Sequence, residues 1–161
     1  MTGFSGSGKS TLSQAVKDKI DMCLGDSTKV YILDGDKIRK GLNSDLGFHQ
    51  DDVYENSRRI GEVAKIMADS GQLIIVAFIS PIAELRDKAR KLHEEAGRPF
   101  IECHMSASIE TCEERDVKGL YAKARMGVIK HFNDPYEAPQ NPELKIDSAK
   151  LSLPHSIDAV F

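Results

Sequence analysis

The fold of this chain is decided by Gly3-Phe4-Ser5-Gly6-Ser7-Gly8-Lys9-Ser10, which has the P-loop spacing G-x-x-x-x-G-K-[ST]. Glycines let the backbone curl tightly, so that successive N–H groups can point at phosphate oxygens. Lys9 adds a positive charge for the β- and γ-phosphates, and the Ser10 hydroxyl can bind Mg²⁺. The residues predicted to hold the nucleotide are Gly6, Ser7, Gly8, Lys9, Ser10 and Thr11.

A P-loop normally lies between a β-strand and a helix. Apolar residues recur at spacings of three and four after the loop and predict a helix from Ser10 to about Met22. This helix would turn its positive dipole end toward the bound phosphates. Only Met1 and Thr2 precede Gly3, so we expect the strand before the loop to lie outside the printed sequence.

Length and composition indicate one globular domain spanning residues 1–161, with 40% hydrophobic and 29% charged residues. The net charge of −3 gives no general attraction to nucleic acid or to an anionic membrane. No apolar run approaches the roughly 18 residues of a transmembrane helix. The cysteines, Cys23, Cys103 and Cys112, have no metal-binding spacing, so we expect free thiols and a cytoplasmic location.

Four short apolar runs predict β-strands, at residues 30–33, 73–79, 100–105 and 144–147. The second run lacks alternation, as is typical of a central parallel strand covered on both faces. Helical patterns separate the strands, and Ser108 is a candidate N-cap for one of them. This alternation predicts an α/β fold, a P-loop kinase-like three-layer domain with a mostly parallel sheet.

Polar residues follow two of these strands directly. Asp34 and Asp36 come after the first strand, and Ser80 comes after the second. In an open α/β sheet, functional groups collect at the carboxyl ends of the strands. We therefore expect the two carboxylates to serve metal or substrate; the alternative is an acidic turn that caps the next helix.

Asp52 and Glu55 have the spacing of a capping box and predict a helix from about residue 53 to residue 71. Arg58 and Arg59 lie near its start, where cations are mildly disfavoured. Their position suggests a salt bridge or a bound anion, with an ordinary solvated face as the alternative.

Residues 116–135 combine a basic excess with possible hinges. The cations are Lys118, Lys123, Arg125 and Lys130, and the hinge glycines are Gly119 and Gly127. Beside a P-loop this composition favours a mobile cationic lid over an ordinary exposed helix. The base-recognition pattern N-K-x-D of small GTPases is absent, so a kinase for a small anionic acceptor is favoured over a GTP switch.

Several longer blocks resemble adenylyl-sulfate kinases (APS kinases). They are residues 33–43 (LDGDKIRKGLN), 46–48 (LGF), 55–60 (ENSRRI), 78–81 (FISP), 115–121 (RDVKGLY) and 134–139 (DPYEAP). The resemblance runs from the P-loop to about Asp147. It implies transfer of the γ-phosphoryl group of MgATP to the ribose 3′-hydroxyl of adenosine 5′-phosphosulfate (APS), which gives 3′-phosphoadenosine 5′-phosphosulfate in sulfate activation.

The same resemblance implies roles for individual residues. Asp36 would meet the acceptor hydroxyl and orient it or take its proton, with Asp34 as the alternative base or a metal ligand. Lys9 and a Ser10-bound Mg²⁺ would stabilise the transferred group. Ser80 is sometimes assigned as a phosphoserine intermediate in this family, but direct transfer is favoured because the acceptor hydroxyl itself can attack.

For the acceptor, Arg39 would hold the phosphosulfate, because a guanidinium fork suits its oxygens. Phe48 would stack on the substrate adenine, with Phe132 of the lid as the opposing face. The other residues on family substrate-binding positions are Asn56, Ile79, Ser80 and Lys118.

The sequence also departs from the family pattern. Val53 replaces a substrate-contacting arginine, which could shift that work to Arg58. In the lid, His131 stands where a glycine is usual, and a Thr-Gly-Ile segment expected after Phe132 is missing.

Two other functions stay open at this point. One is a P-loop kinase for a different small acceptor, which the change at Val53 would favour. The other is an inactive nucleotide-sensing regulatory domain of a sulfurylase fusion, against which the intact Lys9, Asp34 and Asp36 argue. The expected partners are the substrate APS, a second copy of the chain in a homodimer, and an ATP sulfurylase that is fused or separate.

Overall fold

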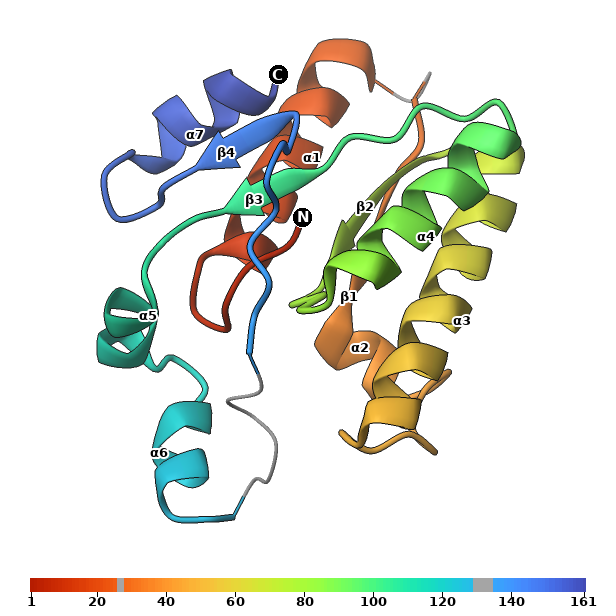
Figure 1. Cartoon of the computed structure of the whole chain (residues 1–161). Coiled ribbons are helices and arrows are strands. Elements are labelled where there is room, and N and C mark those ends of the chain that lie inside the picture. Colours follow the sequence, from red (N-terminus) through yellow and green to blue (C-terminus); the bar gives the residue numbers. More distant parts are fainter. Residues whose placement is uncertain (26–27, 129–134) are drawn as a thin grey trace.

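The computed structural model describes residues 1–25, 28–128 and 135–161 (Figure 1). The strands are β1 (Val30–Asp34), β2 (Leu73–Ala77), β3 (Cys103–Met105) and β4 (Leu144–Ile146). β1 pairs with β2 and β3 pairs with β4, and both pairs are parallel. The predicted α/β class is therefore confirmed, with the second and third strands shorter than expected.

The first three residues join these two strand pairs into one sheet. On one side, the Met1 amino group donates to the carbonyl oxygen of Val76 in β2, at 2.6 Å. On the other side, the Thr2 N–H donates to the carbonyl oxygen of Cys103 at 2.9 Å, in β3. Residues 1–3 thus lie between β2 and β3 and lead directly into the P-loop.

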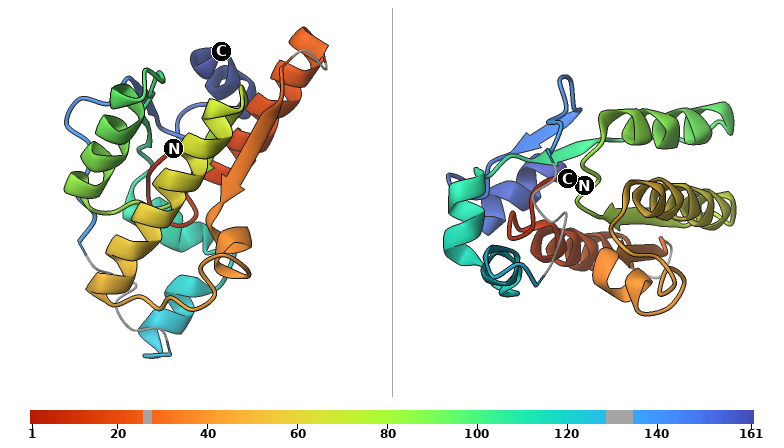
Figure 2. Two further views of the ribbon diagram at one scale, coloured as in Figure 1. Left: turned by 90° about the vertical axis from the view of Figure 1, so that its right-hand side faces the viewer. Right: turned by 60° about the horizontal axis from the view of Figure 1, so that its bottom comes forward.

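Helices cover both faces of this sheet. Their bounds are α1 (Lys9–Leu24), α2 (Gly35–Arg39), α3 (Gln50–Asp69), α4 (Ala83–Glu95), α5 (Ile109–Arg115), α6 (Leu120–Arg125) and α7 (Leu153–Val160). α1 and α7 pack on one face, and α3 and α4 pack on the other, where they lie nearest the viewer in the left view of Figure 2. α2, α5 and α6 gather at the end of the molecule that also carries the P-loop.

The three layers follow from the alternation of side chains along each strand. Val30 of β1 belongs to the core that includes Leu12 of α1. Leu33, three residues later on the same strand, belongs to a second core with Ile60 of α3. Each fully buried aliphatic side chain contributes about 1.5–3 kcal/mol to stability, so the two cores hold both helix layers against the sheet.

The start of α3 differs from the sequence-based expectation. The helix begins at Gln50, and its N-cap residue His49 makes no side-chain capping hydrogen bond. Asp52 instead accepts a hydrogen bond from the Gly47 N–H at 3.0 Å. The predicted capping box was wrong because both acidic side chains have other partners: Asp52 binds the Gly47 N–H, and Glu55 pairs with Arg58 and Arg59 of its own helix. By contrast, Ser108 does cap α5, accepting from the Thr111 N–H.

No helix in the described ranges is both long and apolar enough to span a membrane. The three cysteines are free thiols, with Cys103 and Cys112 buried and Cys23 exposed.

Candidate active site

A cleft of about 770 Å³ opens at the carboxyl ends of the strands. It gathers most of the predicted site residues from across the chain. Those that line it are Gly6, Gly8, Lys9, Ser10, Thr11, Asp34, Asp36, Arg39, Phe48, Asn56, Ile79, Ser80 and Lys118. Ser7, within the P-loop, is fully buried and does not line the cleft. The phosphate cradle and the predicted acceptor side chains therefore share one cavity.

The P-loop owes its shape to glycines at two positions in particular. Gly8 has a φ of 92°, in the left-handed region, and immediately precedes α1. At Gly3, a Cβ would lie 2.5 Å from the backbone oxygen of Met105, so any side chain would collide with β3. The loop thus starts against the sheet and ends by pointing the first N–H groups of α1 into the cleft.

Lys9 curls back beneath its own loop. Its ammonium donates to the carbonyl oxygens of Gly3, at 2.8 Å, and Phe4, at 2.6 Å. Burial lowers the pKa of Lys9 to about 8. A phosphate must therefore compete with two carbonyls for this charge, and it offers a full negative charge in their place.

Asp34 connects the P-loop to the end of β1. The Ser10 hydroxyl donates to Asp34 Oδ2 at 2.7 Å, and the Asp36 N–H donates to Asp34 Oδ1 at 3.0 Å. Partial burial alone would raise the pKa of Asp34, but these hydrogen bonds outweigh it and lower the pKa. Asp34 is also the N-cap of α2, so the turn-capping alternative holds for Asp34.

Asp36 has a different neighbour. Its carboxylate forms an ion pair with Lys118, which lies in the segment between α5 and α6. Asp34 therefore faces the P-loop serine, whereas Asp36 faces the beginning of the predicted lid.

Arg39 and Phe48 form the wall opposite the P-loop. The Arg39 guanidinium lies 4.3 Å from the centroid of the Phe48 ring, and its Nη1 donates to the carbonyl oxygens of Leu46 and Gly47. Burial lowers the pKa of Arg39 from its usual value. Phe48 keeps 48% of its surface exposed, so one face is covered by Arg39 while much of the ring stays accessible.

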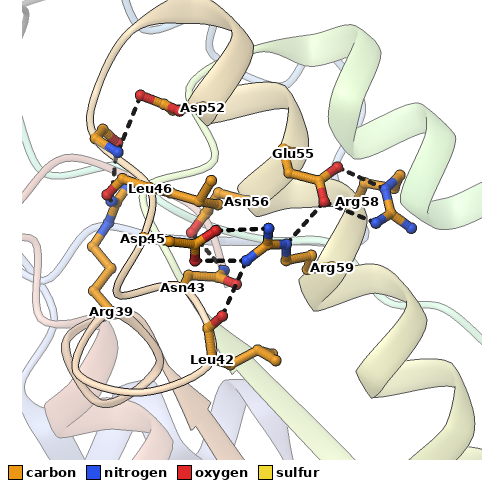
Figure 3. Close-up of polar contacts among 11 residues, drawn as sticks. Arg39, Leu42, Asn43, Asp45, Leu46, Asp52, Glu55, Asn56, Arg58 and Arg59 are labelled. Carbon is orange, nitrogen blue, oxygen red and sulfur yellow. Dashed lines mark hydrogen bonds and ion pairs between the residues drawn. The ribbon is translucent and has the colours of Figure 1, made fainter.

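The loop that carries Phe48 is tied to α3 by charged side chains (Figure 3). Arg59 donates to both carboxylate oxygens of Asp45, at 2.7 and 2.9 Å, and to the Leu42 carbonyl oxygen at 3.1 Å. It also pairs with Glu55 of its own helix. These contacts hold the loop in place beside the cleft.

Ser80 has a φ of 47°, which is uncommon for a residue other than glycine. Its carbonyl oxygen accepts hydrogen bonds from Arg86 Nη1 at 2.7 Å and from the Thr2 hydroxyl at 3.2 Å. Arg86 is buried, pairs with Glu102 and also donates to the Glu137 carbonyl oxygen. Arg86 thus links the end of β2 to the segment that follows the lid.

One predicted acceptor residue of the described ranges, Arg58, does not line this cleft. Arg58 pairs with Glu55 through both carboxylate oxygens, so the salt-bridge interpretation of this arginine is confirmed. It lines a separate cavity of about 490 Å³ that also includes Leu85 and Leu92 of α4. Phe132, together with His131 and the lid between residues 129 and 134, lies outside the described residues.

Sequence reasoning missed residues that contact the P-loop, Arg115 and Ser148 among them. Arg115 Nη1 donates to the Gly6 carbonyl oxygen at 3.2 Å and to the Ser148 hydroxyl at 2.9 Å. The Ser148 hydroxyl in turn donates to the Ser7 carbonyl oxygen at 2.8 Å. Arg115 stands in a block that carries the resemblance, but Ser148 has no sequence signal because its role depends on where β4 ends.

Comparison with known proteins shows the family to which the chain is similar. The family model for adenylylsulphate kinase matches residues 1–147. An adenylyl-sulfate kinase of Geotalea uraniireducens is 50% identical over 163 aligned residues, covering 99% of this chain and 76% of that protein. A solved structure of the Mycobacterium tuberculosis APS kinase, in complex with AMPPNP and APS, superposes with a TM-score of 0.91 at 45% identity, covering 99% and 91% of the two chains. A hexameric APS kinase from Thiobacillus denitrificans superposes with a TM-score of 0.72 at 32% identity, covering 99% of this chain and 26% of that one.

Proposed function

The chain belongs to the adenylylsulphate kinase family, and we propose that its P-loop cleft performs the family reaction with the residues described above. The reaction is ATP-dependent phosphorylation of the 3′-hydroxyl of APS, which yields 3′-phosphoadenosine 5′-phosphosulfate. The observation that carries the residue assignment is the convergence of Lys9, Asp36, Arg39 and Phe48 on one cavity. A two-nucleotide reaction needs such a shared space, because phosphoryl transfer depends on in-line positioning of donor and acceptor.

ATP occupies the P-loop side of the cleft. The N–H groups of the loop and the first turn of α1 bind the β- and γ-phosphates, and Lys9 moves from its two carbonyl partners to the phosphates. Ser10 and Asp34 offer a hydroxyl and a carboxylate that are already in contact, which fits Mg²⁺ because this ion prefers oxygen ligands. Ser10 and Asp34 would hold this ion, which would supply positive charge beside the phosphate oxygens.

APS occupies the side formed by Arg39, Phe48 and Asn56. Within the described ranges, Arg39 uses only Nη1 for protein carbonyls, so its other N–H groups are available to the phosphosulfate. The adenine stacks on the face of Phe48 that Arg39 does not cover. Ile79 and Ser80 line the same side from the end of β2.

Asp36 accepts the proton of the 3′-hydroxyl while the oxygen attacks the γ-phosphorus. Asp36 suits this role better than Asp34, because Asp34 is engaged by Ser10 and by the Asp36 N–H. The hydroxyl itself is the nucleophile, so no covalent intermediate on Ser80 is required. Lys118 leaves Asp36 and binds the acceptor nucleotide when both substrates are present.

A coupled assay of ADP formation tests the function. We expect ADP release that depends on APS and on Mg²⁺, and no comparable release with other small acceptors. Absence of APS-dependent turnover from folded protein would overturn the assignment. The inactive regulatory alternative predicts binding of ATP and product without turnover, and nothing in the described P-loop or at Asp34 and Asp36 favours it.

Partners and location are further parts of this proposal. We propose that the chain forms a homodimer, and light scattering combined with size-exclusion chromatography measures this; a monomeric mass would contradict it. Fusion to, or pairing with, an ATP sulfurylase is tested by co-purification and by the sequence of the full polypeptide. A cytoplasmic location is consistent with the free thiols and with the use of ATP.

A further inference from the structure

Asn43 is buried in a loop whose neighbouring residues are exposed. Its surface is 0% exposed, while Leu42 and Ser44 on either side are exposed. The backbone of Asn43 is held at both ends: its N–H donates to the Ile38 carbonyl oxygen at 3.0 Å, and its carbonyl oxygen accepts from the Leu46 N–H at 3.2 Å. A polar side chain buried this completely needs hydrogen-bond partners.

The Asn43 amide has one partner, and that partner lines the cleft. Asn43 Nδ2 donates to Asn56 Oδ1 at 2.9 Å. Asn43 Oδ1, in contrast, is the single buried side-chain oxygen or nitrogen of the described residues that lacks a hydrogen bond. The Asn43 side chain thus leaves its buried oxygen without a hydrogen bond, while its amide nitrogen binds a predicted APS-binding residue.

The surrounding loop keeps Asn43 in this position. Arg59 lies one turn after Asn56 on α3 and binds Leu42 and Asp45, on both sides of Asn43 (Figure 3). Asn43 is thereby held against the helix that carries Asn56. The hydrogen bond between them is fixed before any ligand arrives.

We propose that Asn43 is a positioning residue that sets the orientation of the Asn56 amide, an inference that rests on the proposed function of the cleft. The two ends of an asparagine amide have nearly the same size but opposite hydrogen-bonding character. Because Asn43 donates to Oδ1 of Asn56, the Nδ2 of Asn56 is left to donate to a ligand in the cleft. Without Asn43 the amide can turn, and an acceptor oxygen then faces the anionic nucleotide.

Steady-state kinetics of Asn43→Leu test this inference. Leucine removes both the donor and the unpaired oxygen while filling a similar volume. We expect the KM for APS to rise about three- to tenfold, the usual effect of one lost hydrogen bond, with the KM for ATP unchanged. Ser44→Ala is the matched control in the same loop, since its exposed side chain makes no hydrogen bond in the described structure, and it should leave both KM values unchanged.

A double-mutant cycle separates positioning from general loosening. In an Asn56→Ala background, Asn43→Leu should add no further rise in the KM for APS, because the group that it orients is gone. Independent, additive effects of the two substitutions would overturn the inference. So would a parallel rise in the KM for ATP with a lower urea midpoint, which is the result expected of a purely structural residue.

Asn56→Asp gives a test that leaves Asn43 intact. Asn43 can still donate to one carboxylate oxygen of Asp at position 56, so the other oxygen faces the cleft. The Asn56→Asp variant should therefore bind APS more weakly than the Asn56→Ala variant does. Equal or tighter binding by Asn56→Asp would overturn the proposed orientation. If the unmodified protein shows no APS-dependent turnover, the proposed function fails instead, so the two failures are distinguishable.

Discussion

Lys118 and Asp36 form an ion pair across the cleft, although 82 residues separate them in the sequence. Both side chains are about half exposed, at 45% and 58%. An ion pair this exposed contributes at most about 1 kcal/mol. It can therefore be exchanged for contacts with substrates at little cost, which suits a lysine at the beginning of a lid and a carboxylate at the acceptor site.

Lys118→Gln removes the positive charge from this pair. We expect a KM for APS that is raised about tenfold, because one charge-assisted hydrogen bond to the acceptor is lost, and a small change in the KM for ATP. Steady-state kinetics with each substrate varied in turn measure the effect. Lys123→Gln, on the exposed face of α6, is the control, and an equal effect of both substitutions would show that only the net charge of the segment matters.

Asp36→Asn keeps the shape of the side chain and removes its ability to take a proton. We expect kcat to fall by about 10²–10⁴-fold, the usual contribution of a general base, while ATP binding measured by calorimetry is retained. Asp87→Asn on the exposed face of α4 serves as the control. Turnover close to that of the unmodified protein would reject Asp36 as the base and turn attention to Asp34.

The buried charge of Lys9 makes stability depend on pH. The pKa of Lys9 falls from 10.5 to about 8 on folding, so between these values the unfolded chain binds more protons and stability rises with pH. Below pH 8 the full cost of burying the charge is present; above about pH 10.5 it has gone. Urea unfolding measures this for the unmodified protein and for Lys9→Met. Between pH 7 and pH 10, the free energy of unfolding of the unmodified protein should rise by about 2 kcal/mol relative to that of the variant.

Using Lys9→Met as the reference cancels the titration of every other group. A difference in stability between the two proteins that stays constant from pH 7 to pH 10 would contradict the burial of this charge. The variant should also lose phosphoryl transfer, because methionine cannot neutralise the phosphates.

Arg86 should matter for stability as well as for the site. Its Nε lies 2.7 Å from Glu102 Oε1, and the two side chains are 8% and 15% exposed. Arg86→Met leaves Glu102 buried without its partner and should cost about 3–5 kcal/mol of unfolding free energy. The double variant Arg86→Met with Glu102→Gln should recover part of this loss in urea unfolding.

A strictly additive loss in that double variant would mean that the ion pair itself contributes little. The hydrogen bonds from Arg86 to the Ser80 and Glu137 carbonyl oxygens would then account for the destabilisation. Because Ser80 has an uncommon backbone conformation, a rise in the KM for APS should accompany either result.

Local patterns account for what the sequence alone determined. The glycine spacing of the P-loop, the apolar runs that became β1 and β2, and the Ser108 cap depend on residues close together in the chain, so each could be predicted from its own segment. The longer blocks that resemble APS kinases extended the prediction to the two substrates, ATP and APS, and to the reaction. The capping box failed because local alternatives competed with it: Asp52 binds the Gly47 N–H, and Glu55 pairs with Arg58 and Arg59 one turn later.

Only the tertiary structure decided which of these residues meet. It paired Lys118 with Asp36, placed the first three residues between β2 and β3, and brought Asn43 into hydrogen-bond contact with Asn56. The physical reason is the same in each case. A charged or polar side chain is stabilised by whichever partner the packing of distant elements supplies, and that partner cannot be identified from spacing along the chain.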